Sequence, residues 1–183
     1  MKKVLVLCVV ALFMIGLTNA QTSKLKIGVG AYIGLPMGNF GDVTSLGFGG
    51  VAQGEYDLAP QIVGTLTTGY LVFSGKTVSG FDMGKWSIIP ILVGGKYFFT
   101  PMFYGTVQIG LNMVSYTNKH VYTGFNPVTG QITYGDATVS SSEFGFNFGV
   151  GYEMKPFDFL VKYGTFGSDA SAISLTALYK FPL

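Results

Sequence analysis

Residues 143–153 read EFGFNFGVGYE, and large apolar residues occupy every second position of this stretch. The other phase holds glycine, asparagine and, at both ends, glutamate. A two-residue period is that of a β-strand with one apolar and one polar face. In all, eight stretches between Leu25 and Phe181 alternate in this way, so the sequence predicts eight amphipathic strands.

The lengths of the connections between these strands follow a regular pattern. Those after the second, fourth and sixth strands are short (58–60, 100–102 and 154–157), whereas the others are longer, above all residues 116–142. Short turns on one rim and long loops on the other are typical of outer-membrane barrels, whose short rim faces the periplasm. The expected strands cover residues 24–34, 46–57, 61–73, 86–99, 103–115, 143–153, 158–165 and 172–181.

The first twenty residues have the pattern of a cleaved signal peptide. Two lysines precede an apolar run at residues 4–17, and Thr18-Asn19-Ala20 forms a small-residue cleavage site. The run is short for a membrane-spanning helix, which needs about 20 residues. Because Cys8 lies within it, we expect a mature chain without disulfides. The expected domains are a signal peptide, 1–20, and an outer-membrane β-barrel domain, 21–183.

The composition argues against a water-soluble surface and against nucleic acid as a partner. Removing the signal peptide leaves 9 lysines (11 − 2) and 9 acidic residues, a net charge of about zero, and the chain has no arginine. It therefore lacks a basic patch for phosphate backbones. Charged residues make up 11% of the chain, whereas a typical soluble domain has about 25%.

The charges also indicate which face of the strands meets lipid. The rest of the polar phase is mostly Gly, Thr, Ser, Gln and Asn, which suits a narrow lumen better than a surface in water. A lysine facing the bilayer midplane costs about 2–4 kcal/mol. The pattern predicts an all-β, eight-stranded antiparallel up-and-down transmembrane β-barrel, rather than a soluble ligand-binding barrel of opposite polarity. Of the 18 charges (20 − 2) outside the signal peptide, ten lie in the expected strands, all on the polar phase: Lys24, Lys26, Glu55, Asp57, Lys96, Glu143, Glu153, Asp158, Lys162 and Lys180.

Aromatic residues cluster at the strand ends beside the short turns. Rings gathered at one level are typical of the interfacial girdle of a membrane barrel. The expected girdle comprises Tyr56, Tyr97, Phe99, Phe103, Tyr152, Phe159, Tyr179 and Phe181.

Pro90 interrupts the alternation of the fourth strand. Since proline donates no ladder hydrogen bond, the sequence predicts a β-bulge at this point. Such a bulge would turn Trp86 from the lumen to the lipid phase, whereas an unbroken strand would point it inward.

Three short motifs suggest a family. Residues 34–41 (GLPMGNFG), 149–154 (GVGYEM) and 178–181 (LYKF) resemble the small outer-membrane β-barrel domain family of the Bacteroidetes type, over essentially the whole chain after residue 20. The resemblance implies a barrel similar in build to the OmpA membrane domain and OmpX, inserted by the outer-membrane assembly machinery. That machinery reads an aromatic-rich final strand, and here Pro182-Leu183 displaces the usual terminal aromatic. The resemblance implies no activity.

Candidates for catalysis are few. His120, the one histidine, lies in the long third loop near Asp136 and Ser140–Ser142, but a triad is defined by geometry rather than by proximity along a loop. Gly28-Val29-Gly30 departs from a dinucleotide fingerprint, because Ile33 occupies the third glycine position. No Cys/His cluster offers a metal site. We expect no catalytic residue, cofactor, metal or enzymatic activity.

The lumen of an eight-stranded barrel is about filled by side chains, and buried charges need partners. This favours a plugged barrel over a pore. The alternative, a small pore or a carrier for apolar ligands, stays open. The expected lumen charge network consists of Glu55, Lys96, Glu143, Glu153, Lys162 and Lys180.

The third loop is where we expect a surface partner of unknown identity to bind. Its centre, Asn126-Pro127-Val128-Thr129-Gly130, is turn-like, so the flanking strands are expected to continue as a hairpin beyond the membrane. Tyr122, Phe125 and Tyr134 would then be available to another surface. The predicted function is a structural or surface-interaction role in the outer membrane of a Gram-negative bacterium, as a monomer surrounded by lipid and lipopolysaccharide.

Overall fold

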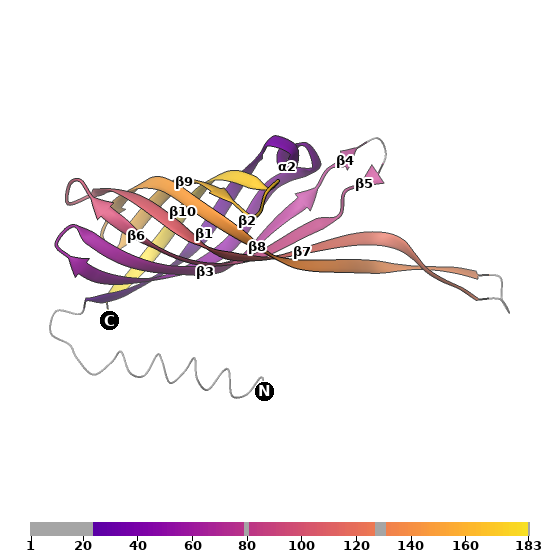
Figure 1. Ribbon diagram of the computed structural model, residues 1–183, viewed down its shortest axis with the longest axis horizontal. Coiled ribbons are helices and arrows are strands. Elements are labelled where there is room, and N and C mark those ends of the chain that lie inside the picture. Colours follow the sequence, from indigo (N-terminus) through magenta and orange to yellow (C-terminus); the bar gives the residue numbers. More distant parts are fainter. Residues whose placement is uncertain (1–23, 79–80, 127–130, 183) are drawn as a thin grey trace, which may run out of the picture.

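The computed structural model describes residues 24–78, 81–126 and 131–182, so the expected signal peptide lies outside the described residues. Eight strands close into a barrel in the order β1-β10-β9-β8-β7-β6-β3-β2, and all neighbours are antiparallel (Figure 1). This confirms the predicted eight-stranded up-and-down β-barrel fold. The barrel strands are β1 (Leu25–Met37), β2 (Thr44–Ala59), β3 (Ile62–Gly75), β6 (Lys85–Phe98), β7 (Phe103–Asn126), β8 (Gln131–Met154), β9 (Phe157–Thr165) and β10 (Ser171–Pro182).

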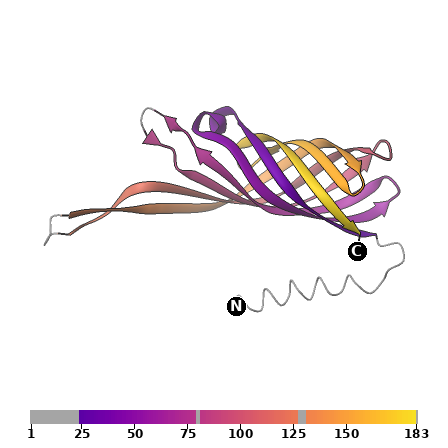
Figure 2. The same ribbon diagram turned by 180° about the vertical axis from the view of Figure 1, so that it is seen from behind.

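The two rims of the barrel differ as the connection lengths predict. At one rim, here called the turn rim, tight connections join β2 to β3, β6 to β7 and β8 to β9. The opposite rim, here called the loop rim, carries the short helix α2 (Gly38–Val43) and a small hairpin of β4 (Thr77–Val78) and β5 (Phe81–Asp82) (Figure 1, Figure 2). Among the described residues, no helix has both the length and the apolar character needed to cross a membrane.

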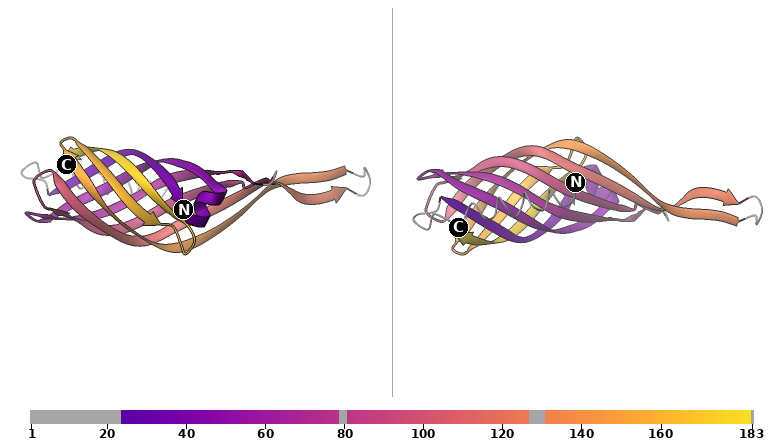
Figure 3. Two further views of the ribbon diagram at one scale, coloured as in Figure 1. Left: turned by 90° about the horizontal axis from the view of Figure 1, so that it is seen from above. Right: turned by 90° about the horizontal axis from the view of Figure 1, so that it is seen from below.

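β7 and β8 are each 24 residues long and continue past the loop rim as a two-stranded ribbon (Figure 1, Figure 3). β7 pairs with β6 only as far as Thr117, whereas its pairing with β8 continues to Asn126. This confirms the predicted continuation as a hairpin. The expected strands at 103–115 and 143–153 are too short, because the polar ribbon lacks the strong apolar phase by which the barrel strands are recognised.

Side chains alternate between the two faces of each strand, and the outer face is apolar. In β7, Val107, Ile109 and Leu111 expose 60%, 49% and 52% of their surface. The inner face instead buries charges such as Glu55 and Lys96. Soluble monomers rarely expose a continuous apolar surface of this kind. The exterior is therefore suited to contact with hydrocarbon.

The predicted bulge at Pro90 is wrong. β6 keeps one register with β7 along its whole length, including the pair Pro90–Asn112. Its register with β3 is the same on both sides of the proline, although the pairs of Pro90 and of the adjacent Ile89 are missing. The ladder thus accommodates the missing N–H by a local gap and not by an extra residue. Trp86 consequently lies on the inward phase and packs against the buried core.

The interior has two unlike halves. Toward the turn rim it holds the buried charges, but toward the loop rim the inward positions are mostly apolar. The expectation of a lumen filled by polar and charged side chains is therefore wrong for the second half. The apolar core comprises Tyr32, Phe40, Val51, Leu71, Phe73, Ile88, Val114, Phe166, Ala172 and Leu178.

Candidate functional site

A charged cluster in the lumen is built around Lys96 of β6, whose side chain is fully buried. Its Nζ lies 2.6 Å from Glu55 Oε1 on β2 and 2.6 Å from Asp158 Oδ2 on β9. Neither strand is a neighbour of β6 in the barrel, so the two ion pairs cross the lumen. These direct ionic partners offset the cost of burying the charge of Lys96 away from water.

Lys180 of β10 completes the cluster. Its Nζ lies 2.9 Å from Glu55 Oε2, 2.6 Å from Glu153 Oε2 and 2.9 Å from Asp158 Oδ2. Tyr104 donates its hydroxyl hydrogen to Asp158 Oδ1 over 2.6 Å. Side chains from six strands therefore meet at one level and fill the lumen there.

The structure brings together four of the six lumen charges expected from the sequence: Glu55, Lys96, Glu153 and Lys180. Glu143 instead lies toward the loop rim, beside Gly167. Lys162 is buried, but it forms no ion pair within the described part of the chain. The expected set lacked Asp158. The tight turn after β8 places Asp158 directly opposite Glu153, and this spacing could have revealed it.

Hydrogen bonds continue from the cluster toward the middle of the barrel. Gln53 Nε2 donates to Glu55 Oε1 over 2.7 Å, and Gln53 Oε1 accepts from Thr67 Oγ1 over 2.9 Å. Gln108 Nε2 in turn donates to Thr67 Oγ1 over 2.8 Å. Because these buried polar groups bond to one another, they form a packed layer rather than a wet passage.

Phe40 of α2 closes the lumen at the loop rim. It is 3% exposed, and its ring centroid lies 5.1 Å from Phe73, 5.6 Å from Trp86 and 6.4 Å from Phe166. Thr44 Oγ1 donates to the Phe40 carbonyl over 2.6 Å and ties the helix to β2. A cavity of about 10 Å³, lined in part by Phe166 and Leu71, lies in the lumen and has room for about one water molecule.

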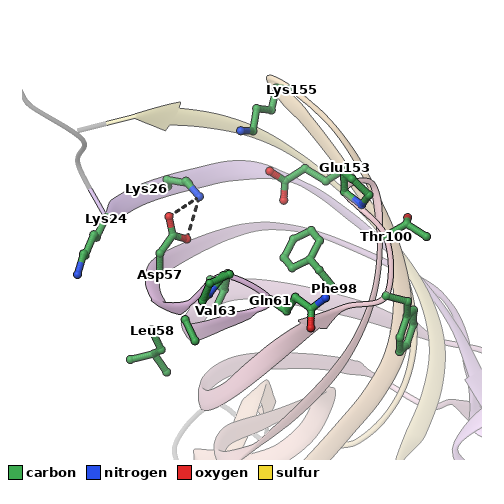
Figure 4. A pocket seen from close by; sticks show the side chains of 14 residues that line it. Lys24, Lys26, Asp57, Leu58, Gln61, Val63, Phe98, Thr100, Glu153 and Lys155 are labelled. Carbon is green, nitrogen blue, oxygen red and sulfur yellow. Dashed lines mark hydrogen bonds and ion pairs between the residues drawn. The ribbon is translucent and has the colours of Figure 1, made fainter.

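At the turn rim the barrel opens into a vestibule of about 770 Å³ (Figure 4). Phe98 and Lys155 line it, and Lys26 on its edge pairs with Asp57 at 2.9 Å. Glu153 belongs both to the vestibule and to the charged cluster. The vestibule thus ends at the cluster and forms a recess rather than a channel.

The expected girdle residues lie on the outer face near the turn rim, where several rings touch. Tyr97 lies 5.7 Å from Phe99, and Phe103 lies 4.9 Å from Tyr152, measured between ring centroids. Tyr56, Phe159, Tyr179 and Phe181 are also exposed on this face. Phe157, which the expected set lacked, lies 5.5 Å from Tyr179.

The other expected interaction residues belong to the β7–β8 ribbon. Tyr122 pairs with Tyr134, and Phe125 with Ile132, across the two strands. The side chains of residues 119–134, including His120, lie outside what the structure describes. In the described part of the chain, no group of three or more His, Cys, Asp or Glu side chains is placed to hold a metal ion.

Solved structures similar to this chain are small outer-membrane barrels. Ail, the attachment invasion locus protein of Yersinia pestis, aligns with a TM-score of 0.59 and 10% identity over 88% of this chain and 100% of Ail. Ail in complex with the heparin analogue sucrose octasulfate aligns at 0.55 and 13%, over 88% and 100%. Neisserial surface protein A aligns at 0.56 and 16%, over 88% and 98%. No protein-family model matches the sequence, and no curated protein matches it significantly. These likenesses establish a shared fold.

Proposed function

We propose that this chain is an integral outer-membrane barrel of a Gram-negative bacterium that acts without catalysis, by presenting its loop rim to another surface. One observation carries the proposal: the β7–β8 hairpin continues well past its last pairing with β6, above a lumen closed at two levels. The apolar exterior supports the membrane location. The names of the similar barrels, an attachment invasion protein and a surface protein, are consistent with such a role.

The ribbon offers a physical means of interaction. Beyond Thr117, β7 pairs with β8 alone, so among the described residues each strand of the ribbon has one partner. Its outer edges therefore present backbone N–H and C=O groups that an extended segment of another protein could pair with. The proposed partner is thus a protein surface with an accessible strand or extended peptide.

The Bacteroidetes-type family and insertion by the outer-membrane assembly machinery are part of the same proposal. The aromatic final strand supports them, since Tyr179 and Phe181 alternate outward on β10. We also propose a monomer, because the eight described strands of the wall close into a barrel by pairing with one another.

The test removes the ribbon while keeping the barrel. Val121 and Gly135 are cross-strand partners, so replacing residues 122–134 by Asn-Gly should close a short hairpin. The matched control replaces residues 77–82 of the β4–β5 hairpin by Asn-Gly, because Met83 N donates to the Lys76 carbonyl over 3.0 Å.

Both variants should fractionate with the outer membrane and keep heat-modifiable gel mobility. The ribbon variant should lose at least about tenfold in binding of whole cells to immobilised host-surface or matrix proteins, while the control binds as wild type. Unchanged binding by the ribbon variant contradicts the surface-interaction role. Steady conductance of the wild type in planar bilayers would instead support the alternative of a small pore.

A further inference from the structure

Near the loop rim, on β3, β6, β7 and β8, the outer face of the barrel changes from apolar to polar side chains. A recess of about 560 Å³ lies there. Two apolar side chains, Ile89 and Met113, line one part of it. The remaining lining residues all carry hydroxyl groups: Tyr70, Ser87, Ser115, Thr117, Ser140, Ser141 and Ser142.

The pairing register arranges three of these hydroxyl groups in a row across β6, β7 and β8, and Tyr70 of β3 reaches this row diagonally. Ser87 of β6 pairs with Ser115 of β7, which pairs with Ser140 of β8. The Ser115 and Ser140 hydroxyl oxygens lie 2.9 Å apart, and Tyr70 donates its hydroxyl hydrogen to Ser87 Oγ over 3.1 Å. A hydroxyl group donates one hydrogen bond and accepts two, so these groups keep capacity for a ligand.

One row farther from the barrel centre lies a positive charge. Lys85 of β6 pairs with Thr117, which pairs with Thr138, and these two threonine oxygens lie 3.0 Å apart. Lys85 is exposed, lies on the outward phase and forms no ion pair with a described residue. Asp136, the next outward carboxylate along β8, lies beyond this row.

One row in the other direction the surface is apolar on β6 and β7, whereas β8 contributes Ser142. Ile89 pairs with Met113, and the next row is the pair Ile91–Leu111. These four side chains are exposed to between 39% and 52%. Apolar, hydroxyl and cationic rows therefore follow one another along the strands.

The hydroxyl row lies at the height of a membrane surface. Ser87 is ten residues from Tyr97, which lies among the turn-rim aromatics. Ten residues rising about 3.3 Å each, on strands tilted by about 40°, span about 25 Å, which is the height of the apolar band of such barrels. If the turn-rim aromatics lie at the inner headgroups, Ser87 lies at the outer headgroups.

We propose that this recess binds the phosphorylated saccharide headgroup of an outer-leaflet glycolipid. Sugar hydroxyls bond to the serine and threonine row, a phosphate contacts Lys85, and the acyl chains lie against Ile89 and Ile91. The continuity of the recess with the apolar band favours an acylated sugar over a free saccharide. This inference rests on the proposed insertion in the outer membrane.

The test places the refolded full-length barrel domain in phosphatidylcholine nanodiscs with a small fraction of deep-rough lipopolysaccharide. Native mass spectrometry then counts the glycolipid molecules that stay bound. K85Q, and separately the triple variant S87A/S115A/S140A, should each lower retention about three- to tenfold, as expected for loss of exposed charged or hydroxyl contacts. Retention of phosphatidylglycerol in parallel discs should not change.

Two variants serve as matched controls. K155Q removes an exposed lysine at the opposite rim, and T68A removes an exposed hydroxyl from the apolar band of β3; both should retain glycolipid as wild type. Equal retention by K85Q, the triple variant and wild type overturns the proposal. So does equally tight binding of the acyl-free core oligosaccharide in detergent, since this would indicate a free-saccharide site. Protease protection and heat-modifiable mobility in the same discs report insertion independently, so a failure to insert counts against the proposed function instead.

Discussion

The two halves of the lumen are closed by different forces. Toward the turn rim, Lys96 and Lys180 meet three carboxylates at distances of 2.6–2.9 Å. Toward the loop rim, Phe40 packs among aromatic rings at 5.1–6.4 Å. A buried ion cluster loses far more than one contact when a member is removed, because its partners stay buried and charged. An apolar core loses stability in proportion to the atoms removed.

The largest expected effect comes from breaking the ionic half. Among the described residues, Asp158 forms ion pairs with Lys96 and Lys180. Lys96→Met leaves Asp158 with Lys180 alone and removes one of the ionic partners of Glu55. The free energy of unfolding should fall by about 3–5 kcal/mol, measured by urea titration in lipid vesicles. The control Lys155→Met, at an exposed lysine, should change it by less than about 0.5 kcal/mol. A loss below about 1 kcal/mol for Lys96→Met would contradict the ionic account.

The next largest expected effect comes from weakening the apolar half. Phe40→Ala should lower the free energy of unfolding by about 3 kcal/mol, the lower end for a buried phenylalanine because α2 can settle into the space. The ionic half remains intact in this variant, so planar-bilayer recordings should show no steady conductance. Steady openings would mean that Phe40, and not the charged cluster, seals the barrel.

A smaller loss of stability is expected when a single hydrogen bond of the ionic half is removed. Tyr104→Phe keeps the ring and removes only the hydroxyl that donates to Asp158. Hydrogen bonds to charged groups contribute about 1.5–3 kcal/mol, and the same urea titration should show a loss in this range. If the stability does not change, the lysines alone satisfy Asp158.

The smallest expected effect concerns Lys162, the buried lysine of β9. Lys162→Met replaces a cation that forms no ion pair in the described residues, so no partner is left unsatisfied. The free energy of unfolding should change by less than about 1 kcal/mol, in either direction. A loss as large as that of Lys96→Met would place Lys162 within the cluster and remove the distinction between paired and unpaired buried charge.

Much of the fold was predictable because a barrel wall repeats one local rule. Each strand alternates by itself, and turn lengths assign the strands to rims, so eight strands and their antiparallel order follow from local pattern. The bulge predicted at Pro90 was wrong, because the strand accommodates the missing N–H by a local gap in its pairing with β3 and keeps its register. The lengths of β7 and β8 were underestimated, because the ribbon lacks the strong apolar phase that marks the strands of the wall.

The candidate site was predictable only in part. Alternation placed Glu55, Lys96, Glu153 and Lys180 on the inner face, but it could not tell which inward charges lie at the same height. That depends on the stagger between strands, which leaves Glu143 and Lys162 apart from the cluster. The place of Asp158 is the exception, because the tight turn after β8 sets it opposite Glu153. The contribution of Phe40 was also hidden, because a residue in a loop follows no strand period.

The sequence by itself determined that this protein is a closed barrel with an apolar exterior, since period, phase and connection length are properties of neighbouring residues. Only the tertiary structure decided how the lumen is closed. Contacts in the lumen join residues that are far apart in the sequence, such as Glu55 and Lys180. Strand tilt and stagger set the height of each such residue along the barrel axis. The same stagger aligned Ser87, Ser115 and Ser140 into one row beneath Lys85, and no local pattern in the chain records that alignment.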